Sequence, residues 1–277
     1  MSYIYKIFKE YKCLLLLIYF YAFVAQLLFL FEPYVLGKMI DGLLVKNYNW
    51  LFVFLAVEII ANIFIYKRMV FDTKVYLRIY NDVIFEYLKR DGNNDPSVKI
   101  ARTDMTNSII NFFENDVQYY IMAVMTIIGS VFFIFLGDVK TGFIVSLAVM
   151  PICFIVMIFY KKIEQSTKVG NNHYEQKISI LAEGDKSEVH TFFERRRKIL
   201  IFSSTLQGKN WSSLNASKTI FLIVSLVVFT NGNLNLTQGQ AVSMYAYINQ
   251  FLISLMSIPV GMETFTRIRD VIGRIKE

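Results

Sequence analysis

Six apolar runs, separated by connections that alternate between rich and poor in basic residues, constrain this chain more than any other feature. The runs cover about residues 13–31, 50–66, 119–136, 142–160, 217–230 and 241–260. Of the 29 Lys and Arg residues, 26 fall in the two terminal segments and in the second and fourth connections. Because basic segments are retained in the cytoplasm, the pattern predicts a multi-pass protein of the inner (cell) membrane, with six transmembrane helices and both termini cytoplasmic.

The composition agrees with a membrane protein. Hydrophobic residues make up 55% of the chain and the mean hydropathy is +0.43, whereas soluble domains hold about 45–50% apolar residues. Four runs approach the roughly 20 helical residues that cross a bilayer core; the second and fifth are shorter. The first run follows three lysines, as a signal peptide does, but it is long for one and no small-residue cleavage site follows, so we expect a retained helix. A soluble helical protein is the alternative, and it leaves the charge alternation unexplained.

Several function classes are disfavoured by the same sequence. The net charge of +7 does not indicate nucleic acid, because the basic residues gather where anionic lipid head groups attract each of them by about 1 kcal/mol. Cys13 and Cys153 lie far apart inside apolar runs, so we expect packing roles rather than a disulfide. His173 and His190 are isolated, so no metal site is predicted. We expect no cofactor and no catalytic residue; the lipid bilayer is the first partner.

The two basic connections, residues 67–118 and 161–216, have helical rather than loop character. In the first, aromatic and apolar residues recur at helical spacing with charges on the other faces: Tyr76, Tyr80, Val83 and Tyr87. Turn residues interrupt the pattern only near 91–97 and 183–187. The sequence therefore predicts one all-α domain over residues 1–277, whose membrane helices continue as long cytoplasmic extensions.

Glu58 is the strongest candidate for a functional residue within the membrane. It lies in the middle of the second run, and Asn62 follows four residues later on the same helical face. An ionisable group inside a bilayer costs about 3 kcal/mol on insertion scales, so such groups usually face a cavity and mark an ion or substrate pathway. The alternatives are a Glu58 that pairs with a neighbouring helix for packing, and a second helix whose membrane boundary lies elsewhere.

Four further polar residues lie within or at the end of apolar runs. Gln26, Asn249 and Gln250 would line a pathway or form hydrogen bonds between helices. Glu32 follows the first run and would lie at an outward-facing mouth. We group these residues with Glu58 as candidates for the substrate or ion pathway.

Two other features suggest moving parts. Arg68 and Asp72 stand four residues apart at the cytoplasmic end of the second helix, which suggests a local ion pair or gate. Pro259 falls in the sixth helix, where it would release a main-chain carbonyl and allow a kink, so it is a candidate hinge.

Short strings along nearly the whole chain are similar to those of one family. Pro33 to Asp41 resembles a P-x-x-x-G-x-x-I-D ending of a first membrane helix, Glu188 to Phe192 an E-V-x-x-F string, and Leu236 to Gly239 an L-T-x-G string. Residues 77–78, 101–104 and 274–275 add weaker matches. In this order they resemble the transmembrane domain of type IV, exporter-fold ABC transporters. The resemblance implies a dimer whose pathway lies between two copies, with helices 4 and 5 crossing to the partner, and a structural role for Asp41.

The chain also departs from that family. It holds no G-x-x-x-x-G-K-[ST] loop, so we expect no ATP-binding domain within it and no ATPase or other enzyme activity of its own. At the first cytoplasmic tip, residues 91–97 read DGNNDPS, with no apolar side chain to insert into an ATPase. Both departures weaken the expectation that this chain is mechanically coupled to an ATPase domain.

The functional prediction therefore has two main forms, which differ in the source of energy for transport. The first hypothesis is a homodimeric transporter driven by an ion or proton gradient, similar in this respect to bacterial peptide-uptake proteins, and moving a small molecule or peptide. The second is the membrane subunit of an ABC transporter whose ATPase is a separate or removed chain. A membrane scaffold without transport activity is a third, less favoured alternative. The sequence leaves the substrate and the direction of transport open.

Overall fold

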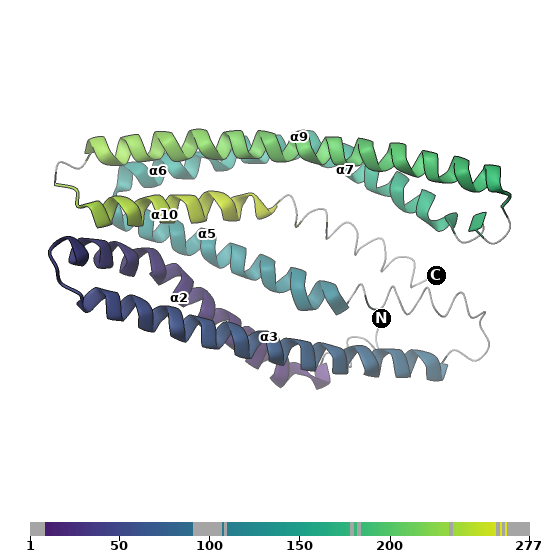
Figure 1. Ribbon diagram of the computed structural model, residues 1–277, viewed down its shortest axis with the longest axis horizontal. Coiled ribbons are helices and arrows are strands. Elements are labelled where there is room, and N and C mark those ends of the chain that lie inside the picture. The colour runs from purple at the N-terminus through teal and green to yellow at the C-terminus, as the bar shows by residue number, and fades with distance from the viewer. Residues whose placement is uncertain are drawn as a thin grey trace.

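The computed structural model describes residues 9–90, 107, 110–177, 180–181, 184–232, 235–258, 261 and 264. All of its regular elements are helical, and they run side by side along one long axis (Figure 1). The elements are α2 (Lys12–Leu44), α3 (Asn49–Arg90), the π-helix η1 (Phe112–Asp116), α5 (Val117–Gly137), α6 (Val139–Leu147), α7 (Val149–Glu175), α9 (Lys186–Gly232) and α10 (Gln238–Leu255). The predicted all-α fold class is confirmed. Pro259 and the tip at residues 91–97 lie outside the described residues.

Five stretches of the described helices are long and apolar enough to cross a membrane. They are Lys12–Leu44, Asn49–Phe85, Phe112–Gly137, Val139–Gly170 and Lys186–Gly232, and they contain the first five predicted runs. The protein is therefore a polytopic membrane protein. Helix α10 covers most of the sixth run, but with Gln238, Gln240, Asn249 and Gln250 it is more polar than the apolar windows of the other five spans. Its place as the sixth span stays a prediction.

Two helices extend far beyond the thickness of a bilayer. Helix α3 has 42 residues and α9 has 47, which at 1.5 Å per residue gives about 63 Å and 70 Å. A bilayer core measures about 30 Å. The expectation that residues 67–90 and 186–216 continue membrane helices rather than form loops is confirmed.

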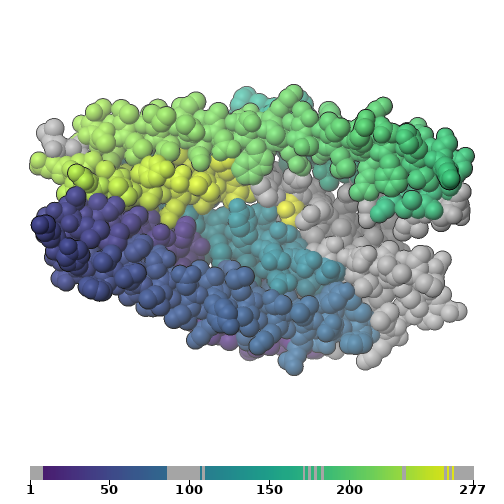
Figure 2. All heavy atoms as spheres, viewed as in Figure 1, coloured from purple at the N-terminus to yellow at the C-terminus, as the bar shows by residue number. Residues whose placement is uncertain are grey.

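The buried apolar side chains form two clusters. The larger lies where α5, α6, α7, α9 and α10 meet, and it includes Ile134, Leu214 and Leu252. The smaller joins α2 to α3 around Ile18, Tyr76 and Ile79. On the face seen in Figure 2, α10 lies between α9 on one side and the α2–α3 pair on the other. Contacts between α10 and α2 therefore connect the two halves of the bundle.

The two cysteines correct one prediction. We expected packing roles for Cys13 and Cys153, but both are exposed on the surface of the chain. They therefore do not pack in the core. The prediction failed because the lipid-facing side of a long apolar helix is as apolar as the side that packs on other helices, so an apolar run does not tell which side a residue occupies.

Candidate functional site

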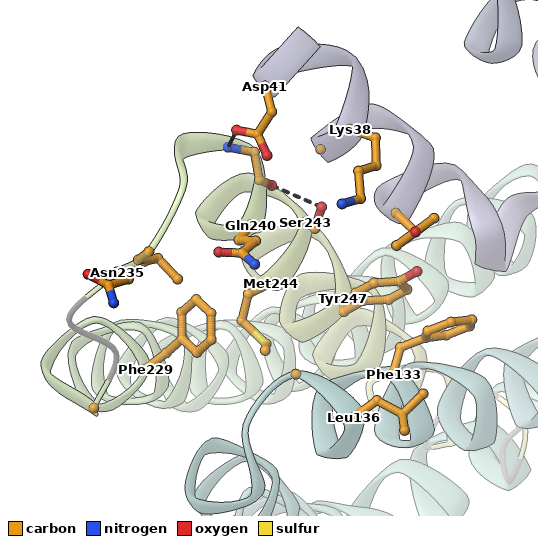
Figure 3. A pocket seen from close by; sticks show the side chains of 16 residues that line it. Lys38, Asp41, Phe133, Leu136, Phe229, Asn235, Gln240, Ser243, Met244 and Tyr247 are labelled. Carbon is orange, nitrogen blue, oxygen red and sulfur yellow. Dashed lines mark hydrogen bonds between the residues drawn. The ribbon is translucent and has the colours of Figure 1, made fainter. Parts of the chain in front are cut away.

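A pocket of about 600 Å³ lies between α2, α5, α9 and α10. We call it the α2–α10 pocket. Helix α2 contributes Tyr34, Gly37, Lys38 and Asp41; α5 contributes Phe133, Leu136 and Gly137; α9 contributes Phe229 and Gly232; Asn235 and Leu236 precede α10, which contributes Gly239, Gln240, Ser243, Met244 and Tyr247. Figure 3 shows these side chains around a common space. Four separate elements thus build the site.

The walls of the pocket differ in polarity. Phe133 stacks on Tyr247 with ring centroids 4.8 Å apart and an interplanar angle of 11°, and further side chains of α5, α9 and α10 extend this apolar wall. On the α2 side, Lys38 Nζ lies 5.8 Å from the centroid of the Tyr34 ring, within cation–π range. The pocket is therefore amphipathic, with a positive charge on one side.

Hydrogen bonds to one carboxylate join α2 to the start of α10 at the pocket. Asp41 Oδ1 accepts a hydrogen bond from the main-chain N–H of Gly239 at 2.8 Å, and its Oδ2 accepts one from Thr237 Oγ1 at 2.8 Å. Thr237 and Gln240 also form a capping box at the start of α10. A carboxylate at a helix N-terminus is favoured by the helix dipole. We call the Asp41, Thr237 and Gly239 contact the α2–α10 latch.

Beside the latch, the main chains of α2 and α10 touch at two glycines. A Cβ added at Gly37 would collide with Ser243 Oγ and the main-chain oxygen of Gly239, and a Cβ added at Gly239 would collide with the main-chain oxygen of Gly37. Only residues without a side chain permit this approach. The two strings noted in the sequence, one around Gly37 and Asp41 and one around Thr237 and Gly239, are thus two sides of a single contact.

A row of polar residues on α10 bonds to the main chain of α2 near Pro33, and Pro33 accounts for one of these bonds. It lies inside α2 and has no N–H to offer the carbonyl of Phe29, four residues earlier. One face of α10 donates three hydrogen bonds to this part of α2: Ser243 Oγ to Pro33 O at 2.7 Å, Tyr247 Oη to Leu30 O at 3.1 Å, and Gln250 Nε2 to Phe29 O at 3.4 Å. Gln250 therefore contacts the main chain of α2, and it does not line the pocket.

The acidic candidates lie on the other face of α2. Glu58 on α3 and Glu32 on α2 are both half-buried. Asn62 is exposed, and its Nδ2 donates to the main-chain oxygen of Glu58 at 2.8 Å. The two carboxylates thus lie on a pair of packed helices, while the Asn62 Nδ2 group is bonded within its own helix. None of the three lines the α2–α10 pocket.

Gln26 connects two helices in the interior. Its side chain is only 6% exposed, and Nε2 donates to Thr126 Oγ1 on α5 at 2.7 Å. Thr126 in turn donates to the main-chain oxygen of Met122 at 2.9 Å. Of the two roles considered for Gln26, the structure shows the hydrogen bond between helices. Asn249 is half-buried on α10 and lies outside the pocket.

A second polar group, the Arg68 cluster, consists of Arg68, Asp72 and Gln118. Arg68 Nε lies 3.7 Å from Asp72 Oδ2, and an Arg68 terminal nitrogen lies 3.4 Å from Met122 Sδ. Asp72 is 7% exposed and Gln118 is 5% exposed. Within the described residues, Arg68 Nε, Asp72 Oδ1 and Gln118 Nε2 have no hydrogen-bond partner. The π-helix η1 comes immediately before α5, the helix that carries Gln118. Short π-helical segments are frequent at functional sites.

The pattern of apolar runs does not indicate several residues that shape the pocket, notably Lys38, Ser243 and Tyr247. A signal for Lys38 was present, because it is one of few basic residues on the basic-poor side of the runs. Ser243, Tyr247 and Gln250 share a helical face, which the spacing also allows. In the described part of the chain, no group of three or more His, Cys, Asp or Glu side chains could hold a metal ion.

Comparison with known proteins identifies the class. A family model described as the ABC transporter transmembrane region matches residues 4–239. The chain belongs to this family, and the resemblance to an exporter-type transmembrane domain is confirmed. It is a membrane transport domain. A search of curated proteins found no match to the sequence.

Proposed function

We propose that this domain moves a small molecule or peptide across the membrane as one of two copies, and that its ligand occupies the α2–α10 pocket. The pocket itself supports this proposal most strongly. Its volume of about 600 Å³ lies within the range of about 300–1,000 Å³ typical of small-molecule sites. Its apolar wall and few polar groups suit a ligand that passes from water into a largely apolar site. Under the predicted topology, the pocket lies near the outer ends of α2 and α10.

We further propose that an ion or proton gradient drives transport through Glu58, with Glu32 as its neighbour. Glu32 and Glu58 lie on neighbouring helices, α2 and α3, and two ionised carboxylates repel in a low-dielectric environment. A proton or cation that binds between them relieves the repulsion, so the pair can respond to a gradient. Asn62 fixes no part of this pair, because its amide bonds to the main chain.

The homodimer is part of the same proposal. In the most apolar window of α3, none of the residues is buried inside the chain, so lipid or a second copy covers this helix. The family resemblance favours a second copy for part of that surface.

A second function is favoured by the geometry at the start of α9. Asp185 and Glu188 cap the helix reciprocally, with the N–H of Glu188 bonded to Asp185 Oδ1 at 2.7 Å. Phe192 is 3% exposed and stacks on His173 with ring centroids 4.2 Å apart. This ordered tip contains the E-V-x-x-F string and would suit docking to a soluble ATPase. The alternative is therefore the membrane subunit of an ABC transporter with its ATPase on another chain.

Purification from native membranes in mild detergent, with an ATPase assay on the same sample, separates these functions. A clean homodimer without ATPase activity supports gradient coupling. A stoichiometric P-loop subunit with vanadate-sensitive activity supports the alternative and contradicts the role of Glu58.

Proton flux into proteoliposomes then tests the coupling residue. Candidate peptides and small molecules are added outside, and an internal pH dye reports proton entry. Glu58→Gln should abolish ligand-dependent flux while folding and dimerisation are unchanged. Glu164→Gln is the matched control, because Glu164 forms an ordinary surface pair with Lys168 at 2.8 Å. Unchanged flux in Glu58→Gln would exclude this residue as the coupling group.

A further inference from the structure

Few basic residues lie on the basic-poor side of the runs, and one of them lines the α2–α10 pocket. They are Lys38, Lys46 and Lys140. Of these, Lys38 lines the α2–α10 pocket, and Figure 3 shows its side chain extending toward Ser243. The other two supply a built-in comparison, because they carry the same charge on the same predicted side of the membrane.

Asp41 forms no ion pair with Lys38, although both residues line the pocket. Both carboxylate oxygens of Asp41 accept hydrogen bonds from the start of α10, where the helix dipole also compensates its charge. Among the described residues, no carboxylate lies within ion-pair distance of Lys38. The Lys38 ammonium therefore lies beside the pocket without an ion-pair partner among the described residues.

The amide of Gln240 adds hydrogen-bond donors to the same space. Its Oε1 accepts from the N–H of Thr237 at 3.0 Å within the capping box, so its oxygen is engaged and its NH₂ group remains as the donor end. Figure 3 shows the Gln240 nitrogen directed toward the pocket. An ammonium and an amide NH₂ together select a ligand group that only accepts hydrogen bonds, which is the property of an anion.

The opposite wall suits an apolar body. Phe133, Leu136, Phe229 and Met244 line it, and Phe133 is held in place by its stack on Tyr247. An inorganic anion would leave this wall without contacts, and a neutral hydrocarbon would leave Lys38 and Gln240 unused. Only a molecule with both parts satisfies both walls.

From this arrangement we propose that the α2–α10 pocket binds an amphiphile with a single anionic head group, a carboxylate or phosphate, at Lys38 and Gln240, and with its apolar part against Phe133 and Met244. This assignment rests on the proposed function, because it names the ligand class of the pocket proposed there as the ligand site. A membrane phospholipid and a free anionic amphiphile share this chemistry.

A single tryptophan can report binding directly. The chain has two Trp residues, and Trp50 packs edge-to-face on Tyr34, a pocket residue, with ring centroids 6.4 Å apart. Trp211→Phe therefore leaves one fluorophore beside the pocket. The full chain in this background is placed in phosphatidylcholine nanodiscs and titrated with dodecyl phosphate and with laurate. Dodecanol and dodecyltrimethylammonium are the neutral and cationic controls.

We expect both anionic probes to bind and both controls to bind at least tenfold more weakly. Lys38→Gln should weaken binding of dodecyl phosphate by about 10- to 100-fold, as for the loss of a charged hydrogen bond. Lys38→Arg should retain binding within about threefold, and Lys46→Gln and Lys140→Gln should leave it unchanged. Equal binding by Lys38→Gln, or equal binding of dodecanol, would overturn the proposal.

The source of the ligand is distinguished in the same assay. Nanodiscs that contain phosphatidylglycerol should compete with dodecyl phosphate, in a manner that depends on Lys38, if the ligand is a membrane lipid; without competition, the ligand is a free amphiphile. Failure of the proposed function has a different signature. Binding that depends on Lys38 without any ligand-dependent flux would leave the ligand class intact and refute transport. Flux with unchanged binding by Lys38→Gln would refute the ligand class alone.

Discussion

Replacing Asp41 by alanine should destabilise the protein by removing the α2–α10 latch. The substitution deletes both acceptors at once, the one for Thr237 Oγ1 and the one for the N–H of Gly239, each at 2.8 Å. These two residues lie almost 200 positions further along the chain, at the start of α10. The loss therefore separates two helices rather than fraying one.

The size of the effect follows from the two bonds. A hydrogen bond to a charged group contributes about 1.5–3 kcal/mol, and the low end applies here because Asp41 and Thr237 are partly exposed. The Thr237 hydroxyl can turn to water, whereas the part-buried Gly239 N–H loses its acceptor. We therefore expect Asp41→Ala to lower the free energy of unfolding by about 2–4 kcal/mol. Asp41→Asn keeps one oxygen acceptor and should cost about half as much.

Unfolding by sodium dodecyl sulfate in mixed micelles, followed by circular dichroism, measures this difference. Asp138→Ala is the matched control, because Asp138 caps α6 only through the neighbouring Thr141 and should cost about 1 kcal/mol. In a double-mutant cycle, Asp41→Ala and Thr237→Val should show a coupling of at least about 1 kcal/mol. An Asp41→Ala variant within about 0.5 kcal/mol of the parent, or a cycle without coupling, would refute the latch.

Three other substitutions have defined outcomes in the same unfolding assay. Gly239→Ala places a Cβ against the main-chain oxygen of Gly37, and the cost should be about 3 kcal/mol because a main-chain atom cannot turn aside; a neutral effect would contradict the close approach. Gln26→Leu removes the bond to α5 and should cost about 1 kcal/mol, so a more stable variant would show that packing outweighs the bond. Asp72→Asn leaves the half-buried charge of Arg68 without its partner at 3.7 Å and should cost about 1 kcal/mol, part of which Arg68→Gln in the same chain should restore.

The membrane helices were predictable because their length and composition are properties that add along a sequence. Run length and the position of basic residues specify helices that cross a bilayer, and five of them are confirmed. The extension of α3 and α9 also followed from helical spacing outside the runs. These features require no knowledge of which helix lies beside which.

The site depended on helix rotation and neighbours, which one sequence does not specify. Gln26 meets Thr126 one hundred positions later, and nothing near either residue indicates the other. The apolar run gives no signal for Lys38, because the run ends at about residue 31, although helix α2 continues to Leu44. Asp41 and Gly239 were noticed in separate strings, but their contact is a property of the fold.

The row of hydrogen bonds between α10 and α2 has a consequence for biogenesis. Helix α10 is the least apolar of the expected spans, and its 18 residues include four Asn and Gln side chains. By hydropathy alone, the insertion of such a segment into a bilayer is less favourable than that of the more apolar spans. The carbonyls at Phe29, Leu30 and Pro33 offer acceptors for its polar face, and α2 is synthesised long before α10. We therefore expect α2 to act as an internal chaperone that holds the last helix in the membrane, so that insertion of the C-terminal part is completed only by folding.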